Sequence, residues 1–228
     1  MKQLVTTAIV LGRTDFGEAD RILTLLTPEY GKLRVVAKGV RRVKSKLAGG
    51  IELFSVSHIT FIKGRGDMGT LSSTRLIKHY GVIVQDIERT MTGYELIKQL
   101  NKLTEDEPEA GYFELLQQSF EALNEPIVPL PLIRTWFTAQ LVRLGGHTPN
   151  LHTDSNGQKL DATMQYDFDT EKQTFVPHPD GGRFTANHIK FLRLIFAGNT
   201  PNVLAQVQGI GALLTACSPL IEIRGQFN

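Results

Sequence analysis

The spacing of the apolar residues changes once along this chain, close to Gly81, and that change limits the folds open to it. Before Gly81 the apolar residues form short runs separated by turn-forming residues, as in β-strands. These runs cover Leu4–Leu11, Ile22–Leu26, Lys32–Ala37, Ile51–Lys63 and Thr70–Ile77. Five short strands within 80 residues, with no helical spacing between them, predict a small β-barrel or β-sandwich.

The fourth of these runs changes phase part-way along its length. Phe54 and Val56 share one face of an extended chain, whereas Ile59 and Phe61 share the other. A bulge or bend near Ser57 explains the change. Because strands of small closed barrels need such irregularities, this run favours a barrel.

After Gly81 the apolar residues recur every three or four positions, which is the spacing of amphipathic helices. Three such stripes lie within residues 84–144 and predict a helical bundle. The third stripe ends at Gly145-Gly146, a pair typical of a helix C-terminal cap. The first stripe consists of Ile87, Met91, Tyr94, Ile97, Leu100 and Leu103.

The last third of the chain has weaker signals. In residues 147–183 only Met164–Phe168 and Thr174–Val176 are β-like, and the polar turn between them predicts a short β-hairpin. Residues 184–197 are helical again, and Thr200-Pro201 begins a final helix. The predicted fold class is therefore α+β, with an N-terminal small β-barrel followed by an α-helical domain that carries a short β-hairpin insertion.

The basic residues are concentrated in the predicted barrel. Residues 1–80 hold 14 Lys and Arg against 6 Asp and Glu, whereas the remaining 148 residues hold 11 against 17. Between Glu29 and Glu52 there is no acidic residue. Because a run of one charge repels itself, we expect an external polyanion to neutralise it, and polyphosphate is the first candidate. The run contains Lys32, Arg34, Lys38, Arg41, Arg42, Lys44 and Lys46.

This basic run has two parts. Residues 32–37 alternate as a strand with one face turned inward, so Lys32, Arg34 and Lys38 share its outer face. After Gly39 the alternation stops, and the remaining basic residues are predicted to form a flexible loop. Barrels of the oligonucleotide-binding type bind strands on such a face and its adjoining loops, so a nucleic-acid site is favoured over an ordinary solvated surface.

Two glycine patterns carry weaker signals. Gly64-x-Gly66-x-x-Gly69 matches a dinucleotide-binding fingerprint, but a strand-like segment follows it where the fingerprint needs a helix. A hairpin loop that holds Arg65 near the nucleic-acid path is the better interpretation. Gln208-Gly-Ile-Gly211 resembles the hairpin of helix-hairpin-helix DNA-binding motifs, but its apolar surroundings favour a packing role.

No arrangement of residues predicts an enzyme, a metal site or a cofactor. The six histidines form no ligand pair with a cysteine at helical or hairpin spacing. Asp167, Asp169 and Glu171 lie beside a predicted turn, where solvated carboxylates are normal. No nucleophile with a companion base and an orienting acid can be picked out.

The same chain gives expectations about compartment and protein partners. The one cysteine, Cys217, excludes an internal disulfide and fits a reducing compartment. No apolar segment reaches about 18 residues, so a cytoplasmic protein without membrane association is expected. Trp136 is flanked by Arg134 and Arg143, a combination that suits an acidic peptide ending in an apolar side chain, although core packing is the plainer role for the tryptophan.

Three segments of the predicted barrel resemble the RecO family of bacterial recombination mediators. The likeness is dense over residues 5–80 and follows the family layout over the rest. It implies an oligonucleotide-binding barrel (OB-fold) over 1–80 and a helical domain over 81–228, with 147–183 as a degenerate zinc-ribbon-like insertion. The segments are Gly17-Glu-Ala-Asp-Arg-Ile-Leu-Thr-Leu-Leu-Thr27, Gly31-Lys-Leu33 and Val36-Ala-Lys-Gly-Val-Arg-Arg-Val-Lys-Ser-Lys-Leu47.

The resemblance also implies a function without bond chemistry. A member of this family binds single- and double-stranded DNA, anneals complementary strands and helps to load the RecA recombinase in the bacterial cytoplasm, at the nucleoid. Its implied partners are RecR and the acidic C-terminal tail of the single-stranded-DNA-binding protein. Arg21 and Arg65 are peripheral phosphate contacts beside the seven residues of the run. Because the run has no aromatic residue, a base-stacking platform must come from elsewhere, with Phe16, Tyr30 or Phe61 as candidates.

One departure from the family pattern concerns zinc. Many relatives carry two Cys-x-x-Cys pairs, whose positions fall here at Asp154 and Gly157 and near Pro177 and Asp180. Four thiolates are therefore missing, so no zinc is expected and the hairpin must be held by packing.

Three alternative functions remain open. An RNA-binding OB-fold protein would use the same basic run, and so would a protein-interaction scaffold whose basic loop docks acidic peptides. An enzyme acting on a nucleotide comes last, because it rests on the glycine pattern alone.

Overall fold

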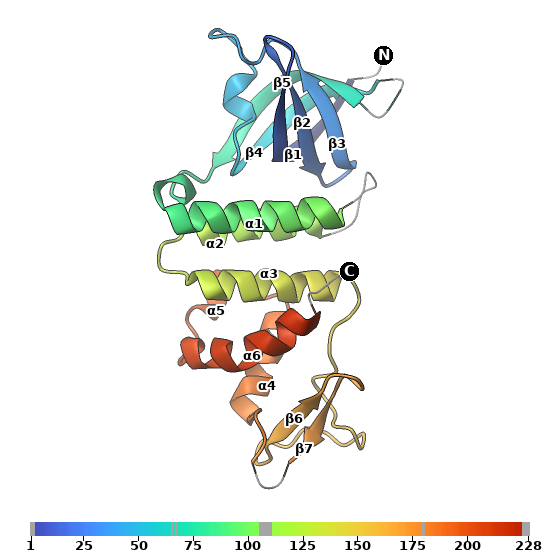
Figure 1. Ribbon diagram of the computed structural model, residues 1–228, viewed down its shortest axis with the longest axis vertical. Coiled ribbons are helices and arrows are strands. Elements are labelled where there is room, and N and C mark those ends of the chain that lie inside the picture. Colours follow the sequence, from blue (N-terminus) through green and yellow to red (C-terminus); the bar gives the residue numbers. More distant parts are fainter. Residues whose placement is uncertain (1–2, 65, 67, 105–110, 179–180, 225–228) are drawn as a thin grey trace. The chain divides into compact units, whose positions relative to one another are not determined.

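Five strands of the N-terminal region close into a barrel in the computed structural model, which describes residues 3–64, 66, 68–104, 111–178 and 181–224 (Figure 1). Their order around the barrel is β1-β2-β3-β5-β4, and β3 pairs with β5 in parallel while the other neighbouring strands are antiparallel. This arrangement is that of an OB-fold. The strands are β1 (Gln3–Phe16), β2 (Asp20–Thr27), β3 (Gly31–Ala37), β4 (Ser55–Ile62) and β5 (Met68–His79).

Alternate side chains of each strand fill the barrel. The core includes Ala8, Val10, Leu23, Leu25, Val35, Ala37, Ile59, Phe61 and Leu71. The β4–β5 register shifts between Val56 and Ser57, which confirms the predicted irregularity near Ser57. The shift lets Ser55, Val56 and Ser57 all be buried in succession, because a bulge turns consecutive residues toward the same side.

The sequence indicated a long turn in the polar segment between the first two apolar runs. The structure instead has strand on both sides of a short connection. β1 continues to Phe16 and β2 begins at Asp20, so only residues 17–19 connect them. Cross-strand pairs such as Thr14 with Ile22 extend the ladder beyond the core. Polar side chains are tolerated there because residues 13–16 are exposed to solvent, while backbone pairing continues the hairpin.

Two helices follow the barrel within the same compact unit, which spans Met1–Pro126. They are α1 (Ile87–Leu103) and α2 (Tyr112–Leu123), preceded by the short 3-10 turn η2 (Ile83–Gln85). Buried Arg89 of α1 donates from its guanidinium to Leu123 O at 2.9 Å and to Pro126 O at 2.7 Å. These bonds satisfy the last carbonyl group of α2, which has no partner inside the helix, and a carbonyl group of the segment that follows it.

The buried face of α1 differs from the predicted stripe. Ile87, Met91 and Tyr94 are exposed, and Gly93 lies in the buried face instead. The reason is close approach to the barrel: a Cβ atom on residue 93 would lie 2.5 Å from the Phe54 ring. Because glycine counts as neither apolar nor bulky in a periodicity search, this contact was not visible in the sequence.

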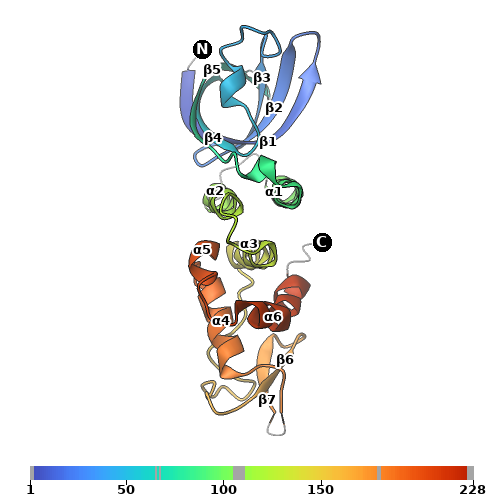
Figure 2. The ribbon, with the colours of Figure 1, turned by 90° about the vertical axis from the view of Figure 1, so that its left-hand side faces the viewer.

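The second compact unit spans Ile127–Asn228 and combines helices with a small hairpin (Figure 2). Helices α3, α4 and α6 contact one another in pairs. β6 and β7 pair antiparallel, which confirms the predicted hairpin insertion and, with the barrel, the predicted α+β class. The elements are α3 (Leu130–Leu144), β6 (Tyr166–Asp169), β7 (Thr174–Pro177), α4 (Ala186–Phe196), α5 (Pro201–Leu204) and α6 (Ile210–Arg224).

The predicted final helix is two helices. α5 ends at Leu204 and α6 begins at Ile210, with Gly209 between them at a φ of 73°. A residue in this left-handed region cannot continue a right-handed helix, and glycine adopts it without steric cost. Among the described residues, no helix is long and apolar enough to cross a membrane.

An aromatic cluster holds the hairpin insertion together. The ring of fully buried Phe175 lies 5.1 Å from Phe168, 5.6 Å from Phe184 and 6.2 Å from Tyr166 between centroids, all edge-to-face. Asp154 accepts hydrogen bonds from the backbone N–H groups of residues 156 and 158. Within the described part of the chain, no three His, Cys, Asp or Glu side chains are placed to hold a metal ion.

Candidate nucleic-acid interface

Strand β3 separates the predicted basic residues into two groups. Lys32 lies near its start and Arg34 at its middle, and both line a pocket of about 150 Å³ together with Lys63 and Phe61. The second group follows the end of β3 and comprises Lys38, Arg41, Arg42, Lys44 and Lys46. At about 3.3 Å per residue, Lys32 and Lys38 are roughly 20 Å apart along the chain. The basic residues therefore lie along β3 and in the loop that follows it.

Lys32 is engaged within the protein. Its Nζ donates to Asn101 O at 3.3 Å and to Thr104 O at 2.5 Å, at the C-terminal end of α1. The last carbonyl groups of a helix have no internal partner and carry partial negative charge, so an ammonium group there stabilises the helix. Arg34 is exposed and remains available on the outer face.

We therefore expect Lys32→Met to lower the free energy of unfolding of the first unit by about 1–2 kcal/mol, because it removes two hydrogen bonds from a charged donor but keeps the apolar stem. Its affinity for single-stranded DNA should change less than twofold. The matched control is Lys38→Met at an exposed lysine, which should leave stability unchanged and weaken binding. Urea unfolding and fluorescence anisotropy measure the two effects, and equal losses of DNA affinity in both variants would contradict this assignment.

The predicted flexible loop is a series of hydrogen-bonded turns. The N–H of Arg42 donates to Gly39 O at 3.1 Å, and that of Ser45 to Arg42 O at 3.0 Å. The N–H of Arg41 donates to Ala19 O at 2.9 Å, which fastens the loop to the tip of the β1–β2 hairpin. The alternation of side chains does not report such turns, because it carries no information about backbone hydrogen bonds.

Two of the predicted arginines have a carboxylate partner. Arg21 Nε lies 2.8 Å from Asp15 Oδ1, and Arg41 Nε lies 3.5 Å from Asp15 Oδ2. The hydrogen bond from Arg21 and the charge of Arg41 hold the pKa of Asp15 below its ordinary value, so the carboxylate stays ionised. Arg21 and Arg41 thus brace the hairpin tip.

The remaining members of the run are free to meet phosphate. Arg34, Lys38, Arg42, Lys44 and Lys46 are exposed, and none forms an ion pair with another residue that the structure describes. Arg65 lies outside the described residues. Lys63 was not among the phosphate contacts predicted from the sequence. Its place at the start of the loop between β4 and β5 was a usable signal, because OB-folds bind nucleic acid with this loop.

The core role favoured for Trp136 is confirmed, and the peptide site considered beside it on α3 lacks the indole ring as a contact surface. Trp136 is 1% exposed, and its Nε1–H donates to Asn199 O at 2.7 Å, so it belongs to the core. Arg134 and Arg143 are exposed on the same helix, and Arg143 Nε donates to Gln140 Oε1 at 2.8 Å. The two arginines are therefore accessible without the apolar surface that was expected between them.

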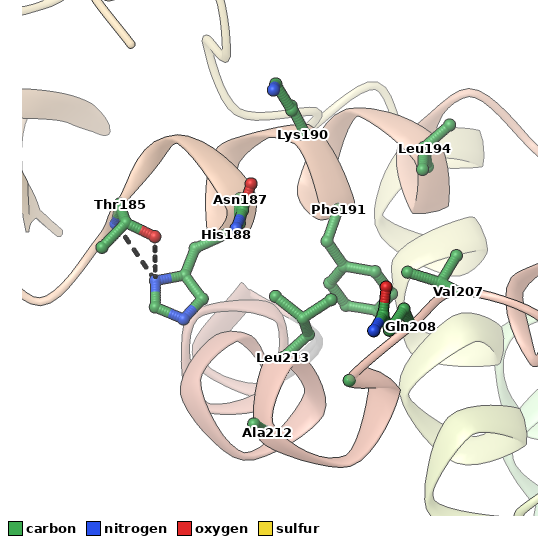
Figure 3. A pocket seen from close by; sticks show the side chains of 11 residues that line it. Thr185, Asn187, His188, Lys190, Phe191, Leu194, Val207, Gln208, Ala212 and Leu213 are labelled. Atoms are coloured by element: carbon green, nitrogen blue, oxygen red, sulfur yellow. Dashed lines mark hydrogen bonds between the residues drawn. The ribbon is translucent and has the colours of Figure 1, made fainter. Parts of the chain in front are cut away.

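A larger pocket, of about 550 Å³, lies between α4 and the start of α6 (Figure 3). Phe191, Leu194 and Leu213 give it apolar walls, and Lys190 contributes a positive charge. Its residues come from two segments, 185–194 and 207–213, and it exists because the turn before α6 folds that helix back against α4. No local sequence pattern predicted this pocket.

Comparison with known proteins follows the same division of the chain. The family described as "Recombination protein O N terminal" matches residues 1–80, and "Recombination protein O C terminal" matches residues 84–216. The chain belongs to the RecO family. The boundary between the two family matches lies between residues 80 and 84, whereas the boundary between the two compact units lies after Pro126. Helices α1 and α2 therefore pack with the barrel although they belong to the C-terminal match.

Curated relatives of this RecO-family chain cover most of its length. "DNA repair protein RecO" of Halalkalibacterium halodurans is 31% identical over 193 residues, which are 82% of this chain and 75% of the relative. That of Dehalococcoides mccartyi is 32% identical over 206 residues, 87% of this chain and 80% of the relative. That of Listeria innocua is 32% identical over 195 residues, with shares of 82% and 75%.

Proposed function

We propose that this RecO-family chain is a DNA repair and recombination protein that binds DNA through its barrel and catalyses no bond chemistry. The observation that carries the proposal is the set of five exposed cations on β3 and the following loop, which lack carboxylate partners among the described residues. Contacts with phosphate position a strand without reading its bases, so binding should tolerate any sequence.

Strand annealing follows from the same charges. Two complementary strands repel each other until their phosphates are neutralised, and the barrel offers exposed basic groups on β3 and in the loop that follows it. Relatives of this chain carry the name DNA repair protein, which fits such a role at the nucleoid in the bacterial cytoplasm. Assistance to RecA loading, together with RecR, completes the proposed function by family analogy.

The acidic tail of the single-stranded-DNA-binding protein is the proposed second partner. The pocket between α4 and α6 supports this, because its apolar walls suit a terminal apolar side chain and Lys190 suits a carboxylate. Exposed Arg134 and Arg143 add positive charge to the same unit.

The test is fluorescence anisotropy of a labelled single-stranded DNA oligonucleotide titrated with the protein at several salt concentrations. Five neutralised phosphates predict that log K falls with log salt at a slope of about −3.5, from about −0.7 per contact. Matched RNA should compete less well than DNA, and complementary oligonucleotides should form duplex faster when the protein is present.

Each rival has its own outcome in this test. Stronger competition by RNA would favour an RNA-binding protein. Binding of the acidic tail peptide without any affinity for oligonucleotides would favour a scaffold. Binding to DNA without faster annealing would remove only the annealing step.

A further inference from the structure

The register of the barrel places one aromatic ring on the same face as the exposed cation Arg34. Paired residues of neighbouring strands point to the same side of a sheet, as do residues two apart on one strand. Phe16 pairs with Asp20 at the end of the β1–β2 ladder. Further along β2 on that side, Ile22 pairs with Val36 of β3.

The proposed phosphate contact Arg34 lies on this same side of the sheet. Thr24, two residues after Ile22, pairs with Arg34. The intervening residues Leu23 and Val35 point the other way and are buried in the barrel core. Phe16, Ile22, Val36 and Arg34 therefore lie on the outer face of β1, β2 and β3, and apolar groups connect the hairpin tip with the arginine.

Phe16 is more exposed to solvent than the other aromatic side chains of the barrel. It is 53% exposed, whereas Phe61 is 2% exposed and packs edge-to-face on Tyr30 at 5.6 Å. Of the three aromatic residues that could stack on a base, Phe61 is thus committed to the core. A lone exposed apolar residue needs no explanation by itself, so the argument for Phe16 depends on what surrounds it.

The surroundings of Phe16 are held rigid and are basic. Arg41 donates from its backbone N–H to Ala19 O at 2.9 Å and from Nη1 to Gly17 O at 3.3 Å, so the basic loop is fastened to the turn that follows Phe16. Asp15 and Arg21 pair on the opposite face of the hairpin, which leaves the Phe16 face open. Exposed Lys38 and Arg42 belong to the fastened loop.

We propose that Phe16 stacks on an unpaired base and makes the hairpin tip of the barrel selective for single-stranded DNA. Aromatic rings beside a basic groove bind bases of any sequence, because every base has a π-face. The bases of a duplex are stacked on each other and offer no free face to the ring. The proposal rests on DNA binding by the barrel and adds to it the residue that distinguishes unpaired from paired strands.

The test compares Phe16→Ala, Phe16→Leu and Phe16→Tyr in anisotropy titrations with a labelled single-stranded oligonucleotide and with a blunt duplex of the same length. The loss of one stacked base weakens single-strand binding by about 5- to 150-fold in the Ala variant. Leu should recover little of the affinity and Tyr most of it. The salt slope and the duplex affinity should remain as in wild type, because no phosphate contact is lost.

Two further variants sharpen the result. Val43→Ala removes a fully exposed apolar side chain from the basic loop and should change neither affinity. Phe16→Trp should show quenched fluorescence when the single strand binds, whereas the buried Trp136 of wild type should not respond. Single-strand binding by Phe16→Ala within twofold of wild type, or equal losses for single strand and duplex, would overturn the proposal while leaving DNA binding intact. A wild type that binds no DNA would overturn both.

Discussion

Phe175→Ala is expected to lower the free energy of unfolding of the second unit by about 3–5 kcal/mol, the usual cost of deleting a buried phenyl ring. The ring is fully buried and contacts three other aromatic rings, so its loss removes the common partner of the cluster that joins β6 and β7. The neighbouring side chains cannot close the cavity, because each is held by its own strand or by the start of α4. Phe175→Leu, which keeps most of the apolar volume, should cost less than half as much.

The chain supplies two reporters for this measurement. Trp136 is the single tryptophan and lies buried in the second unit, so urea unfolding followed by its fluorescence reports that unit. Cys217 is the single cysteine, and burial raises the pKa of its thiol to about 12, so it should react with a thiol reagent only when the unit opens. Phe175→Ala should accelerate that reaction.

A metal chelator tests the alternative that a bound metal ion stabilises the insertion. If aromatic packing holds the hairpin insertion without a metal ion, EDTA should leave the unfolding curve of wild type unchanged. A curve shifted to lower urea by EDTA, together with a small effect of Phe175→Ala, would show that a metal ion and not the rings holds the insertion.

Replacement of Lys38, Arg42, Lys44 and Lys46 by Ala should weaken binding to single-stranded DNA by about 10²–10³-fold at 0.1 M salt. Each phosphate contact contributes about 0.7 to the dependence of log K on log salt, so four contacts account for nearly three decades of affinity between 0.1 M and 1 M salt. The slope of log K against log salt should become less steep, from about −3.5 to about −0.7, which is the contribution of the remaining contact from Arg34. The backbone hydrogen bonds that fasten the loop involve none of the four side chains and should persist.

The matched control removes the same number of charges elsewhere. Lys98, Lys102, Lys159 and Lys172 are exposed and lie outside the basic loop, and their joint replacement by Ala should change affinity only slightly. If both variants lost affinity to the same extent, net charge and not the loop would govern binding. If the loop variant bound like wild type, the phosphate site would have to lie on another surface.

Much of the fold could be predicted from local patterns. Alternation and turn residues located the strands of the barrel, and the phase change near Ser57 was a genuine irregularity of β4. Helical spacing located α1, α2 and α3, and the weak β-like segments formed the hairpin. These features are local, because backbone geometry fixes a period of two in strands and about 3.6 in helices.

The sequence by itself determined where the positive charge is concentrated and which strand carries it. It could not show which of those charges are already used. Lys32 is bound by the end of α1, and Arg21 and Arg41 are bound by Asp15, through contacts between different strands, loops and helices. A periodicity reports the face on which a residue lies but not the group that packs against that face.

Only the tertiary structure decided how the aromatic residues divide between core and surface. The barrel buries Phe61, the second unit buries Trp136, and the long β1–β2 hairpin leaves Phe16 exposed on the face of Arg34. The spacing of these residues in the sequence is no guide, because burial depends on the strands and helices that close over each ring. The phosphate site that we propose is therefore the part of a long basic run that has no internal carboxylate partner among the described residues.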